Sequence, residues 1–211
     1  MNEEEIQDQN QLDELNQFEG LIQGLIDNEY GCCDDFILPS TVDGLSANIQ
    51  LLSESEKLKS SGFGNKSDFK EDDRIRGDKI TWIEEQSINP FEIIYLQKIE
   101  KFILYLNQTC FTAIKSFESH YSFYEKNSFY KRHIDQFKNE KGRKYSIVLY
   151  LNEAWKKEDG GTLSLYPKVG EQINISPIGG RMVLFRSDEM EHEVNPSFTR
   201  SRNSIAGWLK N

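Results

Sequence analysis

The first helical pattern in the sequence lies close to the N-terminus. Between Ile6 and Ile26, apolar residues recur mostly at steps of three and four, with polar and acidic residues between them; they are Ile6, Leu12, Leu15, Phe18, Ile22 and Leu25. This spacing places the apolar residues on one side of a helix. We therefore predict an amphipathic helix over residues 6–26.

A second helical pattern, "NPFEIIYLQKIEKFILYLN", carries its own start signal. Asn89 is a suitable N-cap, Pro90 takes the first helical position, and Glu92 stands where a capping box requires an acid. Apolar residues then follow at steps of 3, 4, 3 and 4, namely Leu96, Ile99, Ile103, Leu106 and Cys110. The pattern predicts a helix with one buried stripe.

After about residue 118 the pattern changes to short aromatic and β-branched runs separated by Gly, Asn and Lys. Four runs are typical of strands: "YSIVLYL" (145–151), "GTLSLYP" (161–167), "RMVLF" (181–185) and "NSIAGWL" (203–209). Helices followed by an all-β module predict an α+β protein whose second part is a sandwich or barrel.

Between the two helical regions, residues 60–78 read "SSGFGNKSDFKEDDRIRGD", which shows no periodicity. A loop this long inside a compact domain often has a function, such as that of a lid. We expect it to be mobile in the absence of substrate and to close when substrate binds.

Length and composition indicate a single globular domain. The chain has 211 residues, of which 37% are hydrophobic, and no apolar run approaches the roughly 18 to 20 residues of a membrane span. The acidic start "MNEEEIQDQNQ" differs from a basic signal peptide, and we expect a cytoplasmic protein with no membrane partner. Cys32, Cys33 and Cys110 show no spacing typical of a disulfide framework.

The net charge of −10 is unevenly distributed. Residues 1–56 contain 14 Asp or Glu and neither Lys nor Arg, so the rest of the chain carries 25 bases against 21 acids. A mildly basic remainder can attract a negatively charged macromolecule. It lacks the interleaved basic and aromatic residues of a nucleic-acid surface, and we expect no direct nucleic-acid partner.

The stretch "FYKRHIDQF" (129–137) contains the first candidate metal ligands, His133 and Asp135. On a strand these two side chains point to the same side, an arrangement that also suits an ordinary hydrogen-bonded pair. His192 follows the predicted strand "RMVLF", from which a second wall of the same barrel could bring it to the site. We expect the remaining histidine, His120, to be structural.

Two His and one carboxylate occupy one face of an octahedral ion and leave three positions open, which suits Fe(II) with a bidentate cosubstrate and dioxygen. A structural zinc site would use four ligands, typically with Cys, and the cysteines lie far from this region. Arg202 offers a planar fork for a carboxylate. Together these residues suit the binding of 2-oxoglutarate, with iron at its keto acid end and Arg202 at its far end.

Six ordered motifs resemble the 2-oxoglutarate and iron(II) dependent prolyl hydroxylases, the group of the hypoxia-inducible-factor prolyl hydroxylases and their bacterial relatives. They are "IRGDKITWIE", "YEKNSFYKRHID", "RKYSIVLYLNEAW", "DGGTLSLYP", "HEVNP" and "RNSIAGW". The resemblance implies a double-stranded β-helix (jelly-roll, cupin-like) with the N-terminal helices packed on its major sheet. It implies His133, Asp135 and His192 as iron ligands and Arg202, rather than Arg200, as the 2-oxoglutarate arginine.

The resemblance also implies roles for residues around the metal. Four match positions that line the cosubstrate pocket, namely Tyr124, Tyr150, Leu163 and Trp208, and four match positions of substrate contact, namely Asp78, Tyr130, Arg143 and, again, Trp208. The family usually has a Pro-Gly-rich turn where this chain has "EKNS" (125–128). The sequence ends three residues after Trp208, without the C-terminal extension of animal members, so we expect the loop before Trp82 and the mouth of the barrel to recognise substrate.

By this resemblance the chain is one oxygenase domain: an acidic helical segment (1–59), a substrate loop (60–80), a supporting helix (81–118) and the β-helix core (119–211). The implied activity is hydroxylation of a prolyl residue in a protein, with Fe(II), 2-oxoglutarate and dioxygen, and ascorbate as reductant. Bacterial relatives suggest a translation factor such as elongation factor Tu as substrate, and animal members suggest oxygen sensing. We expect a monomer. Two alternatives stay open: another oxygenase of the same fold, such as a nucleic-acid demethylase or other residue hydroxylase, and a non-catalytic interaction protein.

Overall fold

The computed structural model describes residues 3–62, 74–136 and 142–211. Within these residues the fold consists of two sheets and three long helices. The elements in chain order are α1 (Glu3–Asn28), β1 (Tyr30–Cys33), α2 (Pro39–Glu54), β2 (Lys59–Ser60), β3 (Asp78–Trp82), α3 (Pro90–Cys110), β4 (Ser116–Tyr124), β5 (Tyr130–His133), β6 (Arg143–Tyr150), the 3-10 turn η1 (Lys157–Asp159), β7 (Leu163–Tyr166), β8 (Ile173–Ile175), β9 (Met182–Arg186), β10 (Glu191–Val194) and β11 (Arg202–Lys210).

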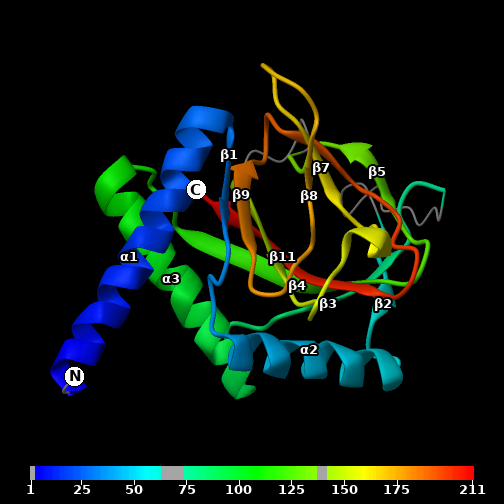
Figure 1. The fold of residues 1–211 in the computed structure, drawn as a ribbon, viewed down its shortest axis with the longest axis horizontal. Coiled ribbons are helices and arrows are strands. Elements are labelled where there is room, and N and C mark those ends of the chain that lie inside the picture. Colours follow the sequence, from blue (N-terminus) through cyan, green and yellow to red (C-terminus); the bar gives the residue numbers. More distant parts are fainter. Residues whose placement is uncertain (1–2, 63–73, 137–141) are drawn as a thin grey trace.

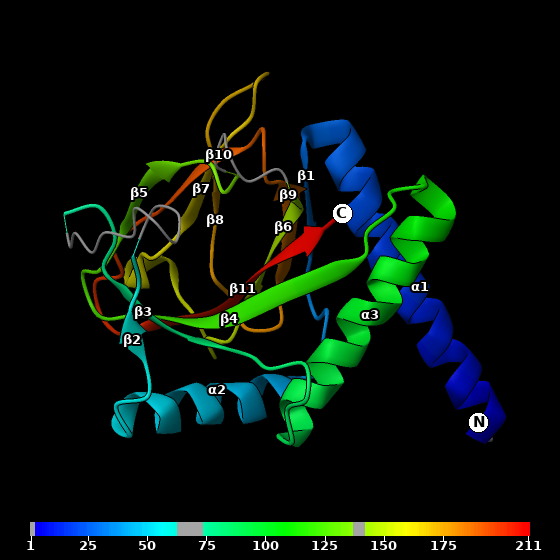
Figure 2. The same ribbon diagram turned by 180° about the vertical axis from the view of Figure 1, so that it is seen from behind.

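The larger sheet has the order β1-β9-β6-β11-β4-β3-β2, and the smaller has the order β5-β10-β7-β8. Neighbouring strands pair antiparallel throughout both sheets. Figures 1 and 2 show the helices on one side of the large sheet and the small sheet on the other. This two-sheet arrangement is the jelly-roll that the family resemblance implies.

The central strands β6 and β9 of the large sheet are buried on both faces, which explains why their runs are almost continuously apolar. In β6, Ile147 and Leu149 pack in the core shared with the helices, whereas Val148 and Tyr150 belong to the core between the sheets. Successive side chains of a strand point to opposite faces. A run such as "YSIVLYL" therefore supplies two cores at once.

Helices α1, α2 and α3 cover the outer face of the large sheet, which is the sheet on which N-terminal helices were predicted to pack. Phe18 of α1, Leu45 of α2 and Ile99 of α3 are buried in one cluster with Ile147 and Leu149 of β6. Among the described residues, no helix is long and apolar enough to cross a membrane.

The predicted apolar side of α1 is buried only in its second half. Phe18 and Ile22 are buried, but Leu12 and Leu15 are exposed. Figure 1 shows the N-terminal part of α1 extending past the body of the protein. From Glu14 onward the helix contacts α3 through Lys98 and Lys101.

The start of α3 confirms the N-cap and corrects the capping box. Asn89 Oδ1 accepts hydrogen bonds from the backbone nitrogens of Phe91 and Glu92 (2.9 and 3.3 Å). The Glu92 carboxylate instead accepts bonds from Ser87, Asn48 and Tyr121 inside the protein. At the other end of the predicted stripe, Cys110 is exposed rather than buried.

Three further features change the prediction from sequence. Helix α2 and the short strands β1 to β3 were not individually predicted from the sequence. The predicted loop at 60–78 lies largely outside the described residues, at 63–73, and Asp78 begins β3, which pairs with β4. In the turn "EKNS", Asn127 takes the left-handed conformation (φ 68°) that a glycine usually adopts. The three cysteines are free, as expected.

Candidate active site

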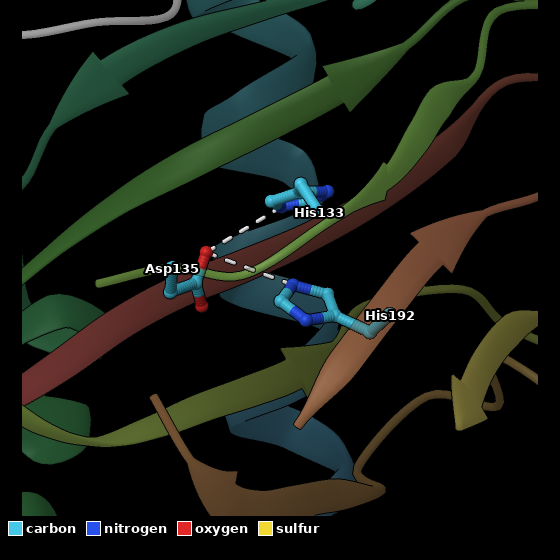
Figure 3. A group of neighbouring side chains, drawn as sticks. All are labelled: His133, Asp135 and His192. Carbon is cyan, nitrogen blue, oxygen red and sulfur yellow. Dashed lines mark ion pairs between the residues drawn. The ribbon is translucent and has the colours of Figure 1, made fainter. Parts of the chain in front are cut away.

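His133, Asp135 and His192 converge at the end of the small sheet (Figure 3). His133 is the last residue of β5 and pairs directly with His192 of β10. Asp135 Oδ1 lies 3.5 Å from His133 Nε2 and 3.6 Å from His192 Nε2. The prediction that Asp135 shares the strand of His133 was wrong: β5 ends at His133, and Asp135 reaches the site from the bend that follows.

Backbone carbonyls fix the orientation of both imidazoles. His133 Nδ1 donates to the Lys131 carbonyl oxygen at 2.7 Å, and His192 Nδ1 donates to the Met190 carbonyl oxygen at 3.1 Å. A carbonyl can only accept, so Nδ1 of each ring carries the hydrogen and Nε2 keeps its lone pair. Both lone pairs are therefore available to a metal on the side of Asp135.

Asp135 is kept ionised in spite of its burial. Burial alone would raise the pKa of this carboxyl. The positive charge that His192 and then His133 carry when protonated, together with the hydrogen bond from the Ser146 hydroxyl, holds it well below its usual range. Ser146 Oγ donates to Oδ2 at 2.6 Å and also contacts Ser187 Oγ at 2.8 Å. Oδ1 stays free of these hydroxyls and faces the two imidazoles.

His192 is neutral near pH 7. Burial, followed by the neighbouring His133, lowers the pKa of His192 to about 4, against a weaker opposing effect of Asp135. A neutral imidazole binds a cation without first losing a proton. Two imidazole nitrogens and one carboxylate oxygen, all within 4.8 Å of one another, form a donor set that fits Fe(II).

One pocket connects this triad with Arg202. Its walls also include Tyr124, Leu163 and Trp208, three of the four residues predicted to line the cosubstrate pocket. Arg202 is 1% exposed; its Nε donates to the Gly161 carbonyl oxygen (2.9 Å) and its Nη1 to Ser204 Oγ (3.2 Å).

Arg202 lacks a carboxylate partner among the described residues. Tyr124 and Tyr150 present their rings to its guanidinium, each at 5.0 Å. The Tyr150 hydroxyl is buried and makes no hydrogen bond within the described chain, and burial raises its pKa to about 12, which keeps it protonated as a donor. A buried cation beside an unused donor fits the distal carboxylate of 2-oxoglutarate.

Arg200 lies elsewhere. Its Nη2 donates to the Glu153 carbonyl oxygen and to Asp159, and the side chain is 41% exposed over Trp155. Side chains two apart on a strand share a face, but Arg200 precedes β11, which begins at Arg202. The structure thus brings Arg202 into the pocket and leaves Arg200 at the surface.

A glycine pair shapes the wall beside Arg202. Gly160 and Gly161 both have positive φ, at 71° and 66°. A Cβ on Gly161 would lie 3.0 Å from the Trp155 ring and 3.4 Å from Arg202 Cδ. The turn therefore needs glycine so that the Gly161 carbonyl can approach the guanidinium.

The residues predicted to contact substrate lie in different surroundings. Tyr130 and Trp208 line the pocket, and Arg143 lies over the Trp208 ring at 3.6 Å, with Nη1 donating to the Asp135 carbonyl oxygen. Asp78 is 2% exposed and bound to Arg76 and Ser61. The Asp78 carboxylate is thus occupied by Arg76 and Ser61, and its contact with substrate stays a prediction.

Sequence reasoning missed Ser146 and Arg76. Ser146 was visible as a polar residue inside the apolar run "YSIVLYL", where a buried hydroxyl requires a partner. Arg76 lines the same pocket but gave no signal of its own in the loop composition of residues 60–78.

Comparison with known proteins agrees with this geometry. The model of the 2OG-Fe(II) oxygenase superfamily matches residues 119–210. Human Egl nine homolog 1 is 30% identical over 191 residues, which cover 86% of this chain and 44% of that protein. The rat homologue is also 30% identical, with 55% of its length covered, so the chain spans about half the length of these relatives.

Two solved structures are similar along nearly their whole length. A Pseudomonas putida prolyl-4-hydroxylase has a TM-score of 0.82 and 30% identity, covering 92% of this chain and 98% of that one. A Trichoplax adhaerens prolyl hydroxylase, in complex with a hypoxia inducible factor oxygen degradation domain peptide fragment, has a TM-score of 0.83 and 27% identity, covering 100% and 94%. The structure brings the triad and Arg202 together inside a jelly-roll, as the sequence motifs predict. This chain belongs to the 2-oxoglutarate and iron(II) dependent prolyl hydroxylase family.

Proposed function

We propose that the protein is a dioxygenase that uses Fe(II) and 2-oxoglutarate to hydroxylate a prolyl residue of a protein substrate. The observation that carries this proposal is that one pocket joins the His133, Asp135 and His192 donors with the guanidinium of Arg202, which has no carboxylate partner among the described residues. Similarity to two prolyl hydroxylases supports proline as the target.

The residues proposed to bind iron and those proposed to bind 2-oxoglutarate come from different parts of the fold. His133, Asp135 and His192 would hold the iron, and Arg202 with the Tyr150 hydroxyl would hold the far carboxylate of 2-oxoglutarate. When bound, iron and 2-oxoglutarate supply the oxidising chemistry: dioxygen is reduced, 2-oxoglutarate becomes succinate and carbon dioxide, and one oxygen atom enters the substrate.

The protein's own contribution is positioning and the exclusion of water. Leu163 and Val194 are buried apolar walls of the pocket, so charges inside it interact more strongly than in water. The Ser146 hydroxyl holds one oxygen of Asp135 and leaves the other for the metal. Trp208 lines the pocket and carries Arg143 stacked on its ring, so this pair is suitably placed to contact a peptide.

Succinate release tests the proposal. The purified protein is given Fe(II), 2-oxoglutarate, dioxygen and ascorbate, with proline-containing peptides, with N-methylated nucleic acid, or with neither. We expect a proline peptide to increase succinate release and to gain one oxygen atom by mass spectrometry. Stimulation by methylated nucleic acid alone would assign another oxygenase of the fold, and a complete lack of succinate would favour the non-catalytic alternative.

A further inference from the structure

The metal ligand His133 is stacked face to face on Tyr130. The ring centroids are 3.6 Å apart and the planes differ by 18°. The guanidinium of Arg76 lies over the same tyrosine ring, with Cζ 4.5 Å from its centroid. Two planar groups this close cannot share one face of the ring, so Tyr130 lies between Arg76 and His133.

Arg76 is itself firmly anchored. Its Nε and Nη2 donate to the two carboxylate oxygens of Asp78 at 2.5 and 2.9 Å, and Ser61 Oγ donates to the same carboxylate at 2.6 Å. The Arg76 side chain is 13% exposed and that of Asp78 is fully buried. Burial alone would raise the pKa of Asp78, but the Arg76 guanidinium lowers it and keeps the pair ionised.

The backbone joins the same groups. Arg76 forms a bridge with Tyr130, the Lys131 nitrogen donates to the Ile75 carbonyl oxygen, and the Gly77 nitrogen donates to the Phe129 carbonyl oxygen. The segment before β3 thus lies along β5, the strand that ends in His133. Arg76, which precedes β3 of the large sheet, therefore contacts the strand of the small sheet that carries the ligand His133.

His133 depends on such support more than His192 does. Its side chain is 17% exposed against 7% for His192, and Phe185 packs beside His192 at 4.7 Å between ring centroids. The bond from Nδ1 of His133 to Lys131 sets the tautomer. One hydrogen bond still allows the ring to tilt, and the Tyr130 ring is the group that lies flat against it.

We propose that Tyr130 and Arg76 are positioning residues for the metal, which hold the His133 imidazole through a guanidinium–phenol–imidazole stack. This inference rests on the proposed function, and it changes the expected role of Tyr130. Because His133 and Arg76 cover both faces of the tyrosine, only its edge and hydroxyl remain for substrate.

The test measures Mn(II) affinity of the folded protein by titration, together with the visible spectrum of the Co(II) form, and it requires no turnover. Variants of partners outside a metal's ligand set typically weaken binding by about 10- to 100-fold, and we expect Tyr130→Leu to fall in that range with an altered Co(II) spectrum. Tyr130→Phe keeps the stack and should bind as the wild type does. Arg76→Gln should lie between the two.

Arg132 and Tyr166 provide matched controls. Arg132 lies over the Tyr166 ring at 3.7 Å, in the same kind of stack. Within the described part of the chain, the rings that pack on the two ligand histidines are those of Tyr130, Phe185 and the histidines themselves, not that of Tyr166. Tyr166→Leu and Arg132→Gln should therefore leave the Mn(II) affinity and the Co(II) spectrum unchanged.

Wild-type affinity in Tyr130→Leu overturns the inference, and so does an equal loss in Tyr130→Phe or in the two controls. If Tyr130→Leu unfolds at the assay temperature, Arg76→Gln decides: unchanged affinity and spectrum overturn the inference, and a loss supports it. Failure of the wild type to bind Mn(II) at all would instead remove the metal site, and with it the proposed function.

Discussion

At the scale of single residues, the surroundings of Arg202 indicate which ligand it binds. It is buried with two neutral hydrogen-bond acceptors, two tyrosine rings and no described carboxylate. A buried cation of this kind is unfavourable unless an anion pairs with it. The distal carboxylate of 2-oxoglutarate supplies that anion in our account.

Arg202→Lys should weaken the binding of 2-oxoglutarate. Lysine keeps the charge but loses the planar fork, and a charge-assisted hydrogen bond contributes roughly 1–3 kcal/mol. The measurement is the KM for 2-oxoglutarate in succinate release, with Arg200→Lys as the control because Arg200 is bound to Asp159 at the surface. A larger effect of Arg200→Lys would contradict this assignment and show that Arg200 holds the cosubstrate.

The burial of His120 leads to a prediction about how stability depends on pH. His120 is 2% exposed, with ring centroids 5.1 Å from Trp82 and 5.4 Å from Trp208. Burial, followed by the charge of Arg76, lowers the pKa of His120 to about 4. The native state thus resists protonation of His120, whereas the unfolded chain accepts it near the ordinary pKa of about 6.5.

The protein should therefore lose stability as the pH falls from about 6.5 towards 4, because the unfolded state binds the additional proton. Between pH 7 and pH 5 the contribution of His120 is about 2 kcal/mol. Urea unfolding of the wild type and of His120→Gln at both values measures it, and His192 titrates equally in both proteins. Parallel losses of stability in the two proteins would contradict the assignment.

At the scale of elements, what the sequence predicted depended on whether the local pattern and the final packing agreed. α3 was predicted from Pro90 to Cys110 because its cap and stripe are both local signals. α2 carries a similar stripe in Val42, Leu45 and Ile49. Gly44 obscured it, and the reason for that glycine lies in tertiary structure: a Cβ there would lie 2.3 Å from the Phe91 ring of α3.

The α3 cap gives an element-scale prediction. Asn89→Ala removes the acceptor of the Phe91 and Glu92 nitrogens, and loss of such a cap typically costs about 1 kcal/mol of stability. Urea unfolding at pH 7 measures the change. Asn10→Ala, at an exposed position of α1, is the control and should not destabilise the protein; an equally stable Asn89→Ala would show that the cap contributes nothing.

At the scale of the whole molecule, the site exists because two sheets face each other. The two histidine ligands come from β5 and β10 of the small sheet, whereas Arg202, Tyr124 and Tyr150 come from β11, β4 and β6 of the large sheet. The sequence motifs indicated which residues meet. They could not indicate the support around them, because the stack of Arg76 on Tyr130 and the bond from Ser146 to Asp135 join segments that only the folded chain brings together.

The most direct test of the central claim is calorimetric titration of the protein with Mn(II) and then, without dioxygen, with 2-oxoglutarate. We predict that the wild type binds both, that His133→Ala and His192→Ala lose the tight Mn(II) site and with it most 2-oxoglutarate binding, and that both variants remain folded. The reason is that each variant removes one of three protein ligands to the metal that holds the keto acid end. Undiminished Mn(II) binding in either folded variant, or 2-oxoglutarate binding that does not depend on the metal, would contradict this account.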